Sequence, residues 1–353
     1  MLKMEKRPSP SVAMSWLSPV FAVLLTVICG AILFVALGKN PVTGLSVFLL
    51  EPIKDLQGWS EVGVKVAPLL LIAVGLSICF RSNVFNIGAE GQLVVGAIAG
   101  GAAGLYFDQG EGGGALMIAV VLLAGMAGGM AWASITAFLR DRFNANEILV
   151  SLMLVYVAQL LLSLLVHGPL RDPEGFNFPQ SRMLSEGFLL PIILDQTRLH
   201  FGIVMALLAS SLGWVFLSRS FAGYRLQVGG MAPAAARYAG FSSRKALWTS
   251  MLLCGALAGL AGTAEVLGPI GQLTPTVSPG YGFAAIIVAY VGRLHPIGVV
   301  FSSFIMALFY IGGELSQSRL GMPNAITGVF QGILLFSLLA CDVLIHYKLS
   351  WRK

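Results

Sequence analysis

Long apolar runs occupy most of this chain, and short polar stretches separate them. Ten runs can be marked, at 16–37, 63–80, 88–106, 115–139, 147–167, 201–218, 246–266, 281–292, 295–313 and 325–345. Nine are long enough, or nearly so, to cross about 30 Å of hydrocarbon as helices that rise about 1.5 Å per residue. The run at 281–292 would cover only about 18 Å, so it is either a broken or tilted half-span or a segment buried among the others. The pattern predicts an all-α, polytopic membrane helix bundle with about ten transmembrane segments, one of them short or broken.

The composition agrees with a membrane protein and argues against a soluble one. Only 11% of the 353 residues are charged and 57% are hydrophobic, whereas about a quarter of the residues of a soluble protein are charged. Lys and Arg number 22 against 16 Asp and Glu, which gives a net charge of +6. These basic residues do not cluster with aromatic side chains on a polar segment. They therefore indicate orientation in the membrane and not binding of nucleic acid.

The distribution of basic residues predicts the topology. With ten crossings and a cytoplasmic N-terminus, fifteen of the 22 Lys and Arg residues lie inside and seven outside, in agreement with the positive-inside rule. We therefore expect a cytoplasmic N-terminal segment at 1–15, a transmembrane domain at 16–345 and a cytoplasmic C-terminal tail at 346–353. The basic start resembles a signal peptide, but its apolar run continues to Leu37 and further runs follow, which favours an uncleaved first helix.

Three polar stretches are too long to be simple connections. In this topology 38–62 and 168–200 are external loops, and the second could contact a soluble partner. The largest internal loop, 219–245, contains Pro233, a run of alanines and Gly240. Proline at a first helical position, helix-forming residues and a closing glycine predict a helix of about two turns. Because basic residues surround it, this helix either docks into a groove of another protein or simply connects two spans.

A dense polar string follows the second apolar run. Asn83, Asn86, Glu90 and Gln92 stand between two runs, where lipid offers no hydrogen-bond partners, so these side chains must satisfy one another or line a wet cavity. A gate or a helix break is one interpretation. The other is a plain cytoplasmic turn in which Asn86 and Glu90 serve as helix caps.

Small residues within the runs indicate close packing. Glycine recurs every fourth residue, as in Gly125 with Gly129 and Gly255 with Gly259, which lets helix backbones approach one another. The four cysteines lie in or beside apolar runs without a CxxC pair, so we predict packing residues and not disulfides. The four histidines lack metal-ligand spacing, and we predict no metal site.

Motifs for covalent chemistry are missing from the sequence. The chain has no GxxxxGK[ST] phosphate loop, no HExxH and no GxSxG, so we predict no ATP hydrolysis and no catalytic residue. An ion-coupled secondary transporter would show acids deep in the spans, but the nearest candidates, such as Glu147 and Asp342, lie toward the ends of runs. A membrane-embedded enzyme would need a cluster of His, Asp or Ser at depth, and the sequence shows none.

Several strings together resemble one family. The strings are SNVFNIGAEGQ at 82–92, NEILVSLML at 146–154, PAAARYAG at 233–240, GALAGLAGTAEVLG at 255–268 and GYGFAAIIVAYVGRLHPIG at 280–298. They are similar to the permease subunits of ATP-binding-cassette (ABC) importers of the ribose and nucleoside (monosaccharide-type) branch, and most similar to nucleoside permeases. The resemblance extends from about Gly63 to the C-terminus.

The resemblance implies a fold similar to that of the cobalamin-importer permease, a bacterial inner-membrane location and alternating access without covalent chemistry in this chain. It implies that this chain binds no cofactor, because ATP and Mg are held by a partner ATPase. The other implied partners are a second related permease or a second copy of this chain, an extracytoplasmic substrate-binding protein and membrane lipid. The loop helix becomes the coupling helix that enters a groove of the ATPase, with contact residues Pro233, Ala235, Ala236, Arg237 and Gly240.

Two positions depart from the family pattern. Ala232 replaces the asparagine that usually precedes the coupling-helix proline, and loss of an N-cap side chain costs about 0.5–2 kcal/mol of helix stability. Val155 replaces the asparagine of a common LMLNY string, which leaves the substrate open. A nucleoside is our first interpretation, and a simple sugar such as ribose or galactose is the alternative. Candidate pathway or gate residues, whose aromatic members suit nucleobase stacking or plain packing, are Asn83, Asn86, Glu90, Gln92, Tyr156, Glu265, Gln272, Tyr281 and Phe283.

Overall fold

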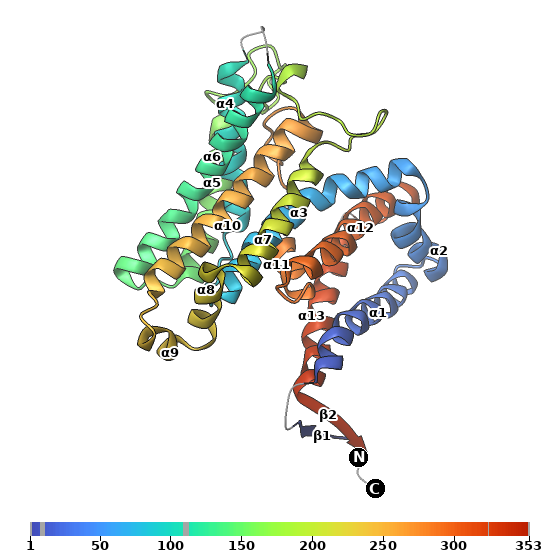
Figure 1. Ribbon diagram of the computed structural model, residues 1–353. Helices are drawn as coiled ribbons and strands as arrows, with labels where there is room; N and C mark the ends of the chain where they lie inside the picture. Colours follow the sequence, from blue (N-terminus) through green and yellow to red (C-terminus); the bar gives the residue numbers. More distant parts are fainter. Residues whose placement is uncertain (1, 8–10, 109–112, 324, 352–353) are drawn as a thin grey trace. The chain divides into compact units, whose positions relative to one another are not determined.

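The computed structural model describes residues 2–7, 11–108, 113–323 and 325–351 (Figure 1). Its regular structure is almost entirely helical, which confirms the predicted fold class. The chain divides into two compact units, Met1–Val62 with Ile305–Lys353, and Gly63–Phe304. In chain order the elements are β1 (Leu2–Lys6), α1 (Val12–Ala36), α2 (Pro41–Leu45), η1 (Ser46–Leu50), η2 (Glu51–Ile53), α3 (Leu56–Arg81), α4 (Ala89–Phe107), α5 (Ala115–Phe143), α6 (Glu147–His167), η3 (Glu186–Phe188), α7 (Gly202–Arg219), α8 (Phe221–Met231), α9 (Pro233–Tyr238), α10 (Ser243–Glu265), η4 (Val266–Ile270), α11 (Tyr281–Val291), α12 (Pro296–Leu320), α13 (Ile326–His346) and β2 (Tyr347–Trp351).

Each of the ten apolar runs coincides with a helix, namely α1, α3 to α7 and α10 to α13. Among the described residues, 8 helices are long and apolar enough to cross a membrane. The other two of the ten are α4, with 19 residues, and α11, with 11 residues. The short run is therefore a short helix, as predicted, and the residues that precede it after Ile270 are not helical.

The unit formed by the two ends of the chain has an aromatic core. Phe48 of η1 stacks on Phe330 of α13 with ring centroids 4.0 Å apart, and Phe34 and Phe309 pack around this pair. A methyl group on Gly312 of α12 would lie 2.0 Å from the carbonyl oxygen of Phe48. Glycine at this position therefore lets α12 rest directly on the backbone of η1.

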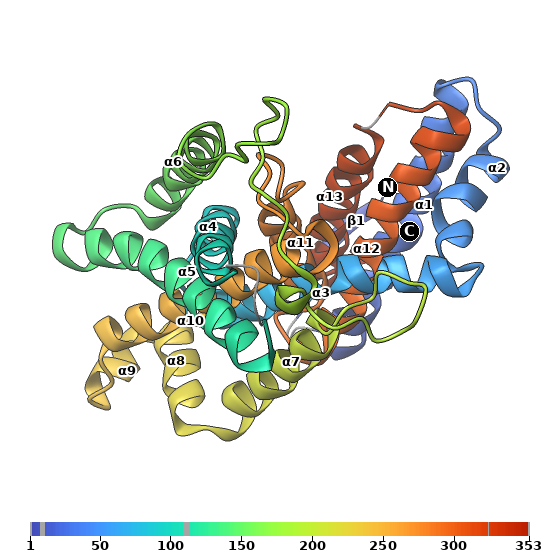
Figure 2. The same cartoon turned by 90° about the horizontal axis from the view of Figure 1, so that it is seen from above.

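The two termini pair with each other in this unit. Strands β1 and β2 are antiparallel, in a register that runs from Leu2 opposite Trp351 to Lys6 opposite Tyr347 (β1 is labelled in Figures 1 and 2). We expected plain tails here. Apolar and polar residues do alternate in both segments, which is the pattern of a strand, but five residues are too few to predict pairing across the whole chain.

The predicted loop at 38–62 is also largely helical. Asn40 accepts hydrogen bonds through Oδ1 from the Val42 and Thr43 N–H groups at 2.9 and 3.4 Å, and Pro41 opens α2. This cap followed by proline is a helix-start signal that the sequence contains. After η1 and η2, α3 begins at Leu56, several residues before the apolar run.

Glycine contacts hold the second unit together. A methyl group on Gly96 of α4 would lie 2.2 Å from Cα of Gly259 in α10, and one on Gly129 of α5 would lie 2.1 Å from the carbonyl oxygen of Gly255. Thr263 of α10 donates to the Gly96 carbonyl at 3.1 Å. The glycine spacing therefore has the predicted role, because it brings α4, α5 and α10 into backbone contact.

The segment at 168–200 crosses the end of α10 in this second unit. Its Leu184 N–H donates to the Gly271 carbonyl at 2.9 Å, and its Leu190 N–H donates to the Leu267 carbonyl at 2.7 Å. Asp108, just after α4, accepts from both the backbone and the hydroxyl of Ser185 at 2.9 Å. The segment is thus fixed to the fold, while Phe176 at its outer part is 93% exposed.

Candidate functional site

The polar string after α3 places the start of α4 beside the middle of α10. Asn86 donates through Nδ2 to Gln92 Oε1 at 3.0 Å and to Cys254 Sγ at 3.2 Å, and its Oδ1 accepts from Gln92 Nε2 at 3.2 Å. Both amides are buried. Cys254 lies about 16 Å along α10 from the first residue of that helix. The prediction that these polar side chains satisfy one another is thus confirmed for Asn86 and Gln92. The contact with Cys254 places the segment before α4 against the middle of α10.

Glu90 connects the first turn of α4 to the first turn of α11. Its Oε2 accepts a hydrogen bond from the Gly282 N–H at 2.6 Å, and the side chain is only 1% exposed. A methyl group on Gly282 would lie 2.2 Å from the Glu90 nitrogen, so the two helix starts touch. The carboxylate lies between two helix N-termini, whose N–H groups and dipoles favour a negative charge. Glu90 therefore caps a helix far away in sequence and not the turn in which it stands.

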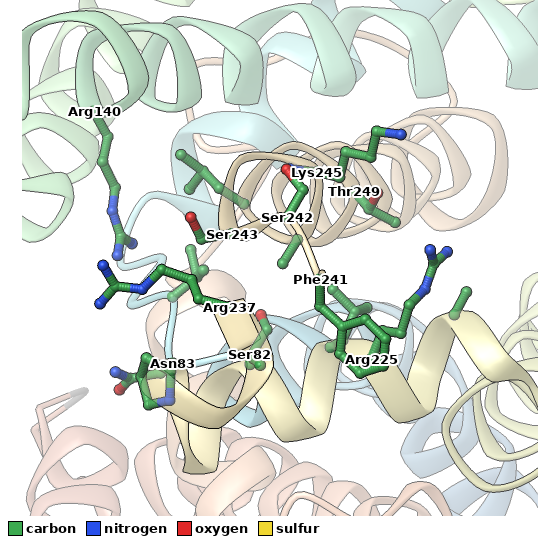
Figure 3. Close-up of a pocket in the computed structure, with 18 residues that line it drawn as sticks. Ser82, Asn83, Arg140, Arg225, Arg237, Phe241, Ser242, Ser243, Lys245 and Thr249 are labelled. Carbon is green, nitrogen blue, oxygen red and sulfur yellow. The ribbon is translucent and has the colours of Figure 1, made fainter. Parts of the chain in front are cut away.

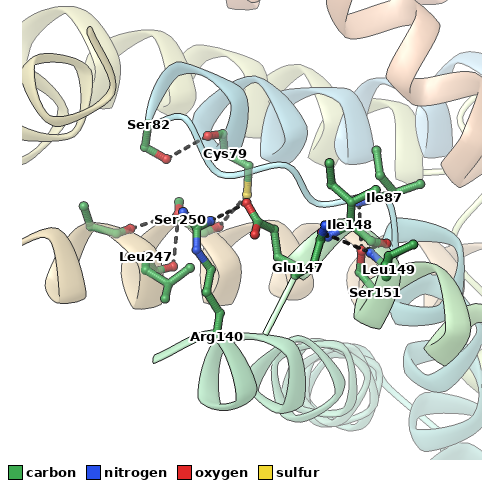
Figure 4. A network of polar contacts seen from close by, with 12 residues as sticks. Cys79, Ser82, Ile87, Arg140, Glu147, Ile148, Leu149, Ser151, Leu247 and Ser250 are labelled. Carbon is green, nitrogen blue, oxygen red and sulfur yellow. Dashed lines mark hydrogen bonds and ion pairs between the residues drawn. The ribbon is translucent and has the colours of Figure 1, made fainter. Parts of the chain in front are cut away.

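A second group of polar contacts joins the α5–α6 connection to the same string (Figure 4). Asn146 caps α6 by accepting from the Ile148 N–H at 2.9 Å, and Ser151 in the next turn accepts from the Ile87 N–H at 3.2 Å. Nearby, Cys79 at the end of α3 donates through Sγ to the Ser250 carbonyl of α10 at 3.2 Å. The strings at 82–92, 146–154 and 280–298 thus meet around the start of α4, and Cys254, just before the string at 255–268, also contacts them.

Arg81, the last residue of α3, links two segments that lie far from it in the sequence. Its Nε donates to the Leu294 carbonyl, just after α11, at 2.8 Å, and its Nη1 donates to Gln227 Oε1 of α8 at 2.9 Å. Burial lowers the pKa of His295, and the positive charge of Arg81 lowers this pKa further. The guanidinium thus joins the internal loop to the end of the short helix whose start Glu90 caps.

Buried charge gathers where α10 ends. Glu265 is 4% exposed, its Oε1 has no hydrogen-bond partner among the described residues, and Lys65 and Arg198 act on it electrostatically. Lys65 also lies over the ring of the buried Tyr281, with Nζ 5.8 Å from the ring centroid. Gln272 is separate from this group, because it donates to Gln180 Oε1 at 3.3 Å in the segment at 168–200.

The remaining pathway candidates do not join these clusters. Tyr156 on α6 is 56% exposed, Phe283 on α11 is 39% exposed, and Asn83 is exposed in a left-handed conformation with φ 56°. Within the part of the chain that the structure describes, the predicted set therefore divides into the buried Asn86, Gln92 and Glu90, the charged group around Glu265 and Tyr281, and isolated residues.

Sequence reasoning missed Lys65, Arg81 and Cys254. Lys65 stands inside an apolar run, and an ionisable residue within a span is a signal of function that was available. Arg81 and Cys254 gave no such signal, because each acts through partners that only the fold brings near.

The predicted loop helix is present as α9, preceded by α8 (Figure 1). It begins with Pro233, has no side-chain cap at Ala232, and ends before Gly240, whose φ is +77°. The Phe241 N–H returns to the Ala236 carbonyl at 2.8 Å, which is a glycine-dependent helix end. The missing cap agrees with the sequence, in which Ala232 replaces the asparagine that usually precedes the coupling-helix proline.

The predicted contact residues of α9 lie on two faces. Ala236 is 4% exposed and packs inward, whereas Pro233, Ala235, Arg237 and Gly240 are exposed. Tyr238, which the sequence analysis did not select, is 97% exposed. The exposed surface of α9 therefore includes Ala235 and Tyr238, whereas Ala236 packs the helix against its own chain.

Comparison with known proteins gives a consistent result. Residues 59–339 match the family described as branched-chain amino acid transport system / permease component. The chain is similar to a glucose ABC transporter permease protein of Haloferax volcanii, with 31% identity over 99% of this chain and 93% of that protein. It is also similar to a guanosine ABC transporter permease protein of Bacillus subtilis, at 31% identity over 90% and 91% of the two chains. A nucleoside ABC transporter permease protein of Lactococcus lactis subsp. cremoris is 25% identical over 91% of this chain and 89% of that protein.

Proposed function

Because the chain belongs to the family of branched-chain amino acid transport system permease components, we propose that it forms one half of the membrane pathway of an ATP-driven importer. The family confirms a multi-pass ABC transporter permease, a transport component that is not itself catalytic. The finer statements about ATPase, substrate and orientation are our proposal. The observation that carries it is the exposed helix α9 at the end of a bundle built around two meeting helix starts.

Helix α9 is the proposed contact with a separate ATPase. Ala235 and Tyr238 present a small and an aromatic side chain to the outside, which suits insertion into a groove. From α9 the contacts run through Gln227 of α8 to Arg81 and on to the end of α11. At its other end α11 meets Glu90. Movement of α9 would therefore reach α4 and α11 through hydrogen-bonded, closely packed elements, and ATP and Mg would stay in the partner.

The proposed assembly has a second permease half, either a related chain or a copy of this one, and a substrate-binding protein on the outer side. The segment at 168–200 suits that outer contact, because it is fixed to α10 by hydrogen bonds yet exposes Phe176. The pairing of β1 with β2 supports a common side for the two termini. With the excess of basic residues on that side, the proposed orientation in a bacterial inner membrane has both termini in the cytoplasm.

A nucleoside is the substrate that we propose. Two of the three relatives described above are named for guanosine or nucleosides. The third, which is similar over 99% of this chain, is named for glucose, so a simple sugar is the second candidate. A nucleoside contains a sugar, and it differs by a flat base that an aromatic side chain can stack on.

Uptake measurements separate these candidates. Cells with and without this gene are compared for uptake of labelled guanosine, adenosine, ribose and glucose. The proposal expects gene-dependent uptake of the nucleosides that an excess of unlabelled ribose does not inhibit. Gene-dependent uptake of ribose or glucose alone would replace the nucleoside by the sugar.

The contact of α9 with the ATPase has its own test. Ala235→Glu places a charge on the exposed face of α9, and burying it in a dry interface costs roughly several kcal/mol. ATPase co-purification and uptake should fall together while the amount of permease in the membrane stays unchanged. Ala325→Glu is the matched control, since Ala325 is exposed just before α13. Normal co-purification of the Ala235→Glu variant would show that α9 only connects α8 to α10.

A further inference from the structure

A cavity of about 400 Å³ lies between α9 and the rest of the second unit (Figure 3). Helices α8 and α9, the start of α10, the end of α5 and the segment just after α3 contribute to its wall. Its volume lies within the range of about 300–1,000 Å³ that is usual for small-molecule sites. The cavity is on the inner face of α9, where Ala236 packs, and not on the face with Ala235 and Tyr238.

The lining is basic. Arg140, Arg225, Arg237 and Lys245 line the cavity, and no Asp or Glu is among the lining residues. The two acids nearest in sequence to Arg140 both form ion pairs. Glu147 pairs with Arg140 at 2.6 Å, and Asp141 pairs with Arg244 at 2.7 Å. Among the described residues, Arg237 and Lys245 form no ion pair. The charges of Arg237 and Lys245 are therefore not neutralised by an acid among the described residues, whereas the charge of Arg140 is paired with Glu147.

Two of the basic side chains face one another in a way that suits an anion. Figure 3 shows the guanidinium groups of Arg140 and Arg237 directed toward one another on one side of the cavity, with Arg225 and Lys245 on the other. Like charges repel, and an anion held between them turns this repulsion into attraction. Arg140 and Arg237 come from α5 and α9, so an anion between them would connect two elements that are far apart in the chain.

The chemistry of the wall favours phosphate. Guanidinium groups present planar pairs of donors that match phosphate oxygens, and the hydroxyls of Ser242 and Ser243 line the same cavity. Apolar side chains, among them Leu226 and Phe241, complete the wall. A phosphate that carries an apolar or glycerol group would therefore find both kinds of contact.

We propose that this cavity binds a phosphate group, carried either by a phospholipid headgroup or by a soluble phosphate compound. The bound phosphate connects α9 to α5 through Arg237 and Arg140, and Arg225 and Lys245 add positive charge to the same cavity. It braces α9 from its inner side and leaves the outer face free. Binding to this site does not depend on the proposed substrate or on the ATPase, so it can be tested on the chain alone.

The experiment uses the full-length chain purified in a non-ionic detergent. Native mass spectrometry measures binding of phosphatidylglycerol against phosphatidylethanolamine, and equilibrium dialysis measures binding of labelled inorganic phosphate. The test variant is Arg237→Gln with Lys245→Gln. The control is Arg142→Gln with Arg219→Gln, which removes the same charge at two exposed positions outside the cavity. A charge-preserving variant, Arg237→Lys with Lys245→Arg, checks that the fold tolerates changes here.

The proposal expects binding of phosphatidylglycerol in preference to phosphatidylethanolamine, or binding of inorganic phosphate. The first result identifies a lipid as the source, and the second a soluble phosphate. The test variant should bind at least about tenfold more weakly, since a single hydrogen bond to a charged group is worth about that factor or more. The control and the charge-preserving variant should bind nearly as the unchanged chain does.

Two results would overturn the proposal. The first is absence of both phosphate binding and preference for the anionic lipid. If the test variant then also lost ATPase co-purification, the cavity would be assigned to an acidic side chain of the partner. The second is an equal loss of binding in the test variant and the control, which would indicate attraction to the whole basic surface.

Discussion

Glu90 and Gly282 are separated by 192 residues, and the Glu90 carboxylate accepts the Gly282 N–H at 2.6 Å. The contact joins the starts of α4 and α11, the two of the ten expected segments that are not among the long apolar helices. Both starts are reached by non-helical chain, 82–88 before α4 and 271–280 before α11. Helix starts that meet inside a bundle present N–H groups and positive dipole ends to each other, and the Glu90 carboxylate lies where they favour a negative charge.

The first prediction concerns this contact. Glu90→Ala removes a charge-assisted hydrogen bond worth about 1.5–3 kcal/mol and leaves the Gly282 N–H without its acceptor. Thermal unfolding in detergent, followed by size-exclusion chromatography, should show a lower midpoint for Glu90→Ala and a smaller change for Glu90→Gln, which keeps an acceptor oxygen. Glu174→Ala is the control, because Glu174 is exposed. Equal midpoints for Glu90→Ala and Glu174→Ala would contradict the capping role.

The second prediction concerns Arg81. Arg81→Ala removes the bonds to Leu294 and Gln227, so motion of α8 and α9 would no longer pass to α11. ATP-dependent uptake should fall by about tenfold or more, as loss of two hydrogen bonds to a charged group allows, while the ATPase still co-purifies and hydrolyses ATP. Arg142→Ala, at an exposed position of α5, should leave uptake unchanged. Uptake that persists in the Arg81→Ala variant would remove this residue from the coupling path.

The third prediction concerns the glycine contacts between α4 and α10. Gly96→Ala would place a methyl group 2.2 Å from Cα of Gly259, and forcing the backbones apart costs about 1–3 kcal/mol. The same substitution at Gly332 of α13, where the added methyl would meet nothing within 4 Å beyond its own stretch of helix, should be neutral or stabilising by up to about 1 kcal/mol. Unfolding midpoints of the two variants measure the difference. A Gly96→Ala midpoint as high as that of Gly332→Ala would show that the backbones are not in contact.

The fourth prediction is a pH dependence. Burial lowers the pKa of His200 from 6.5 to about 4, and its Nδ1 accepts from the Gly202 N–H at 3.1 Å. The unfolded chain therefore binds a proton below about pH 6.5 that the folded chain takes up only near pH 4. Stability should decrease as the pH falls through this window, by up to about 3 kcal/mol.

Unfolding midpoints measured between pH 7 and 4 test this for the unchanged chain, His200→Gln and His167→Gln. His200→Gln should show a smaller decrease than the other two, because the buried imidazole is gone. His167 serves as the control, since it is exposed at the end of α6. Parallel curves for all three proteins would show that His200 does not limit stability in acid.

The sequence predicted those features that depend on nearby residues. Apolar runs located all ten main helices, and the proline and glycine of 233–240 located α9, because each signal is contained in the segment itself. The partner of Gln92 was also near, at Asn86. Glu90 found its partner 192 residues away, and the pairing of β1 with β2 joins the two ends of the chain. Such contacts depend on the assembled fold, so composition and spacing do not predict them.

The orientation of α9 was likewise not predictable from the sequence. Its alanines look alike in the sequence, yet Ala236 is buried and Ala235 is exposed. Which of them faces the bundle depends on how α8 and Phe241 place the helix. A charge at Ala236 would therefore test the packing of the chain against itself, and a charge at Ala235 tests contact with a partner.

The most direct test of the account is nucleoside uptake into proteoliposomes. One preparation contains the purified chain alone, and the other contains the chain with its co-purified ATPase, partner permease and binding protein, each measured with and without ATP. The account predicts labelled nucleoside uptake only by the complete assembly and only with ATP, since this sequence contains no phosphate loop. Uptake by the chain alone without ATP would contradict it.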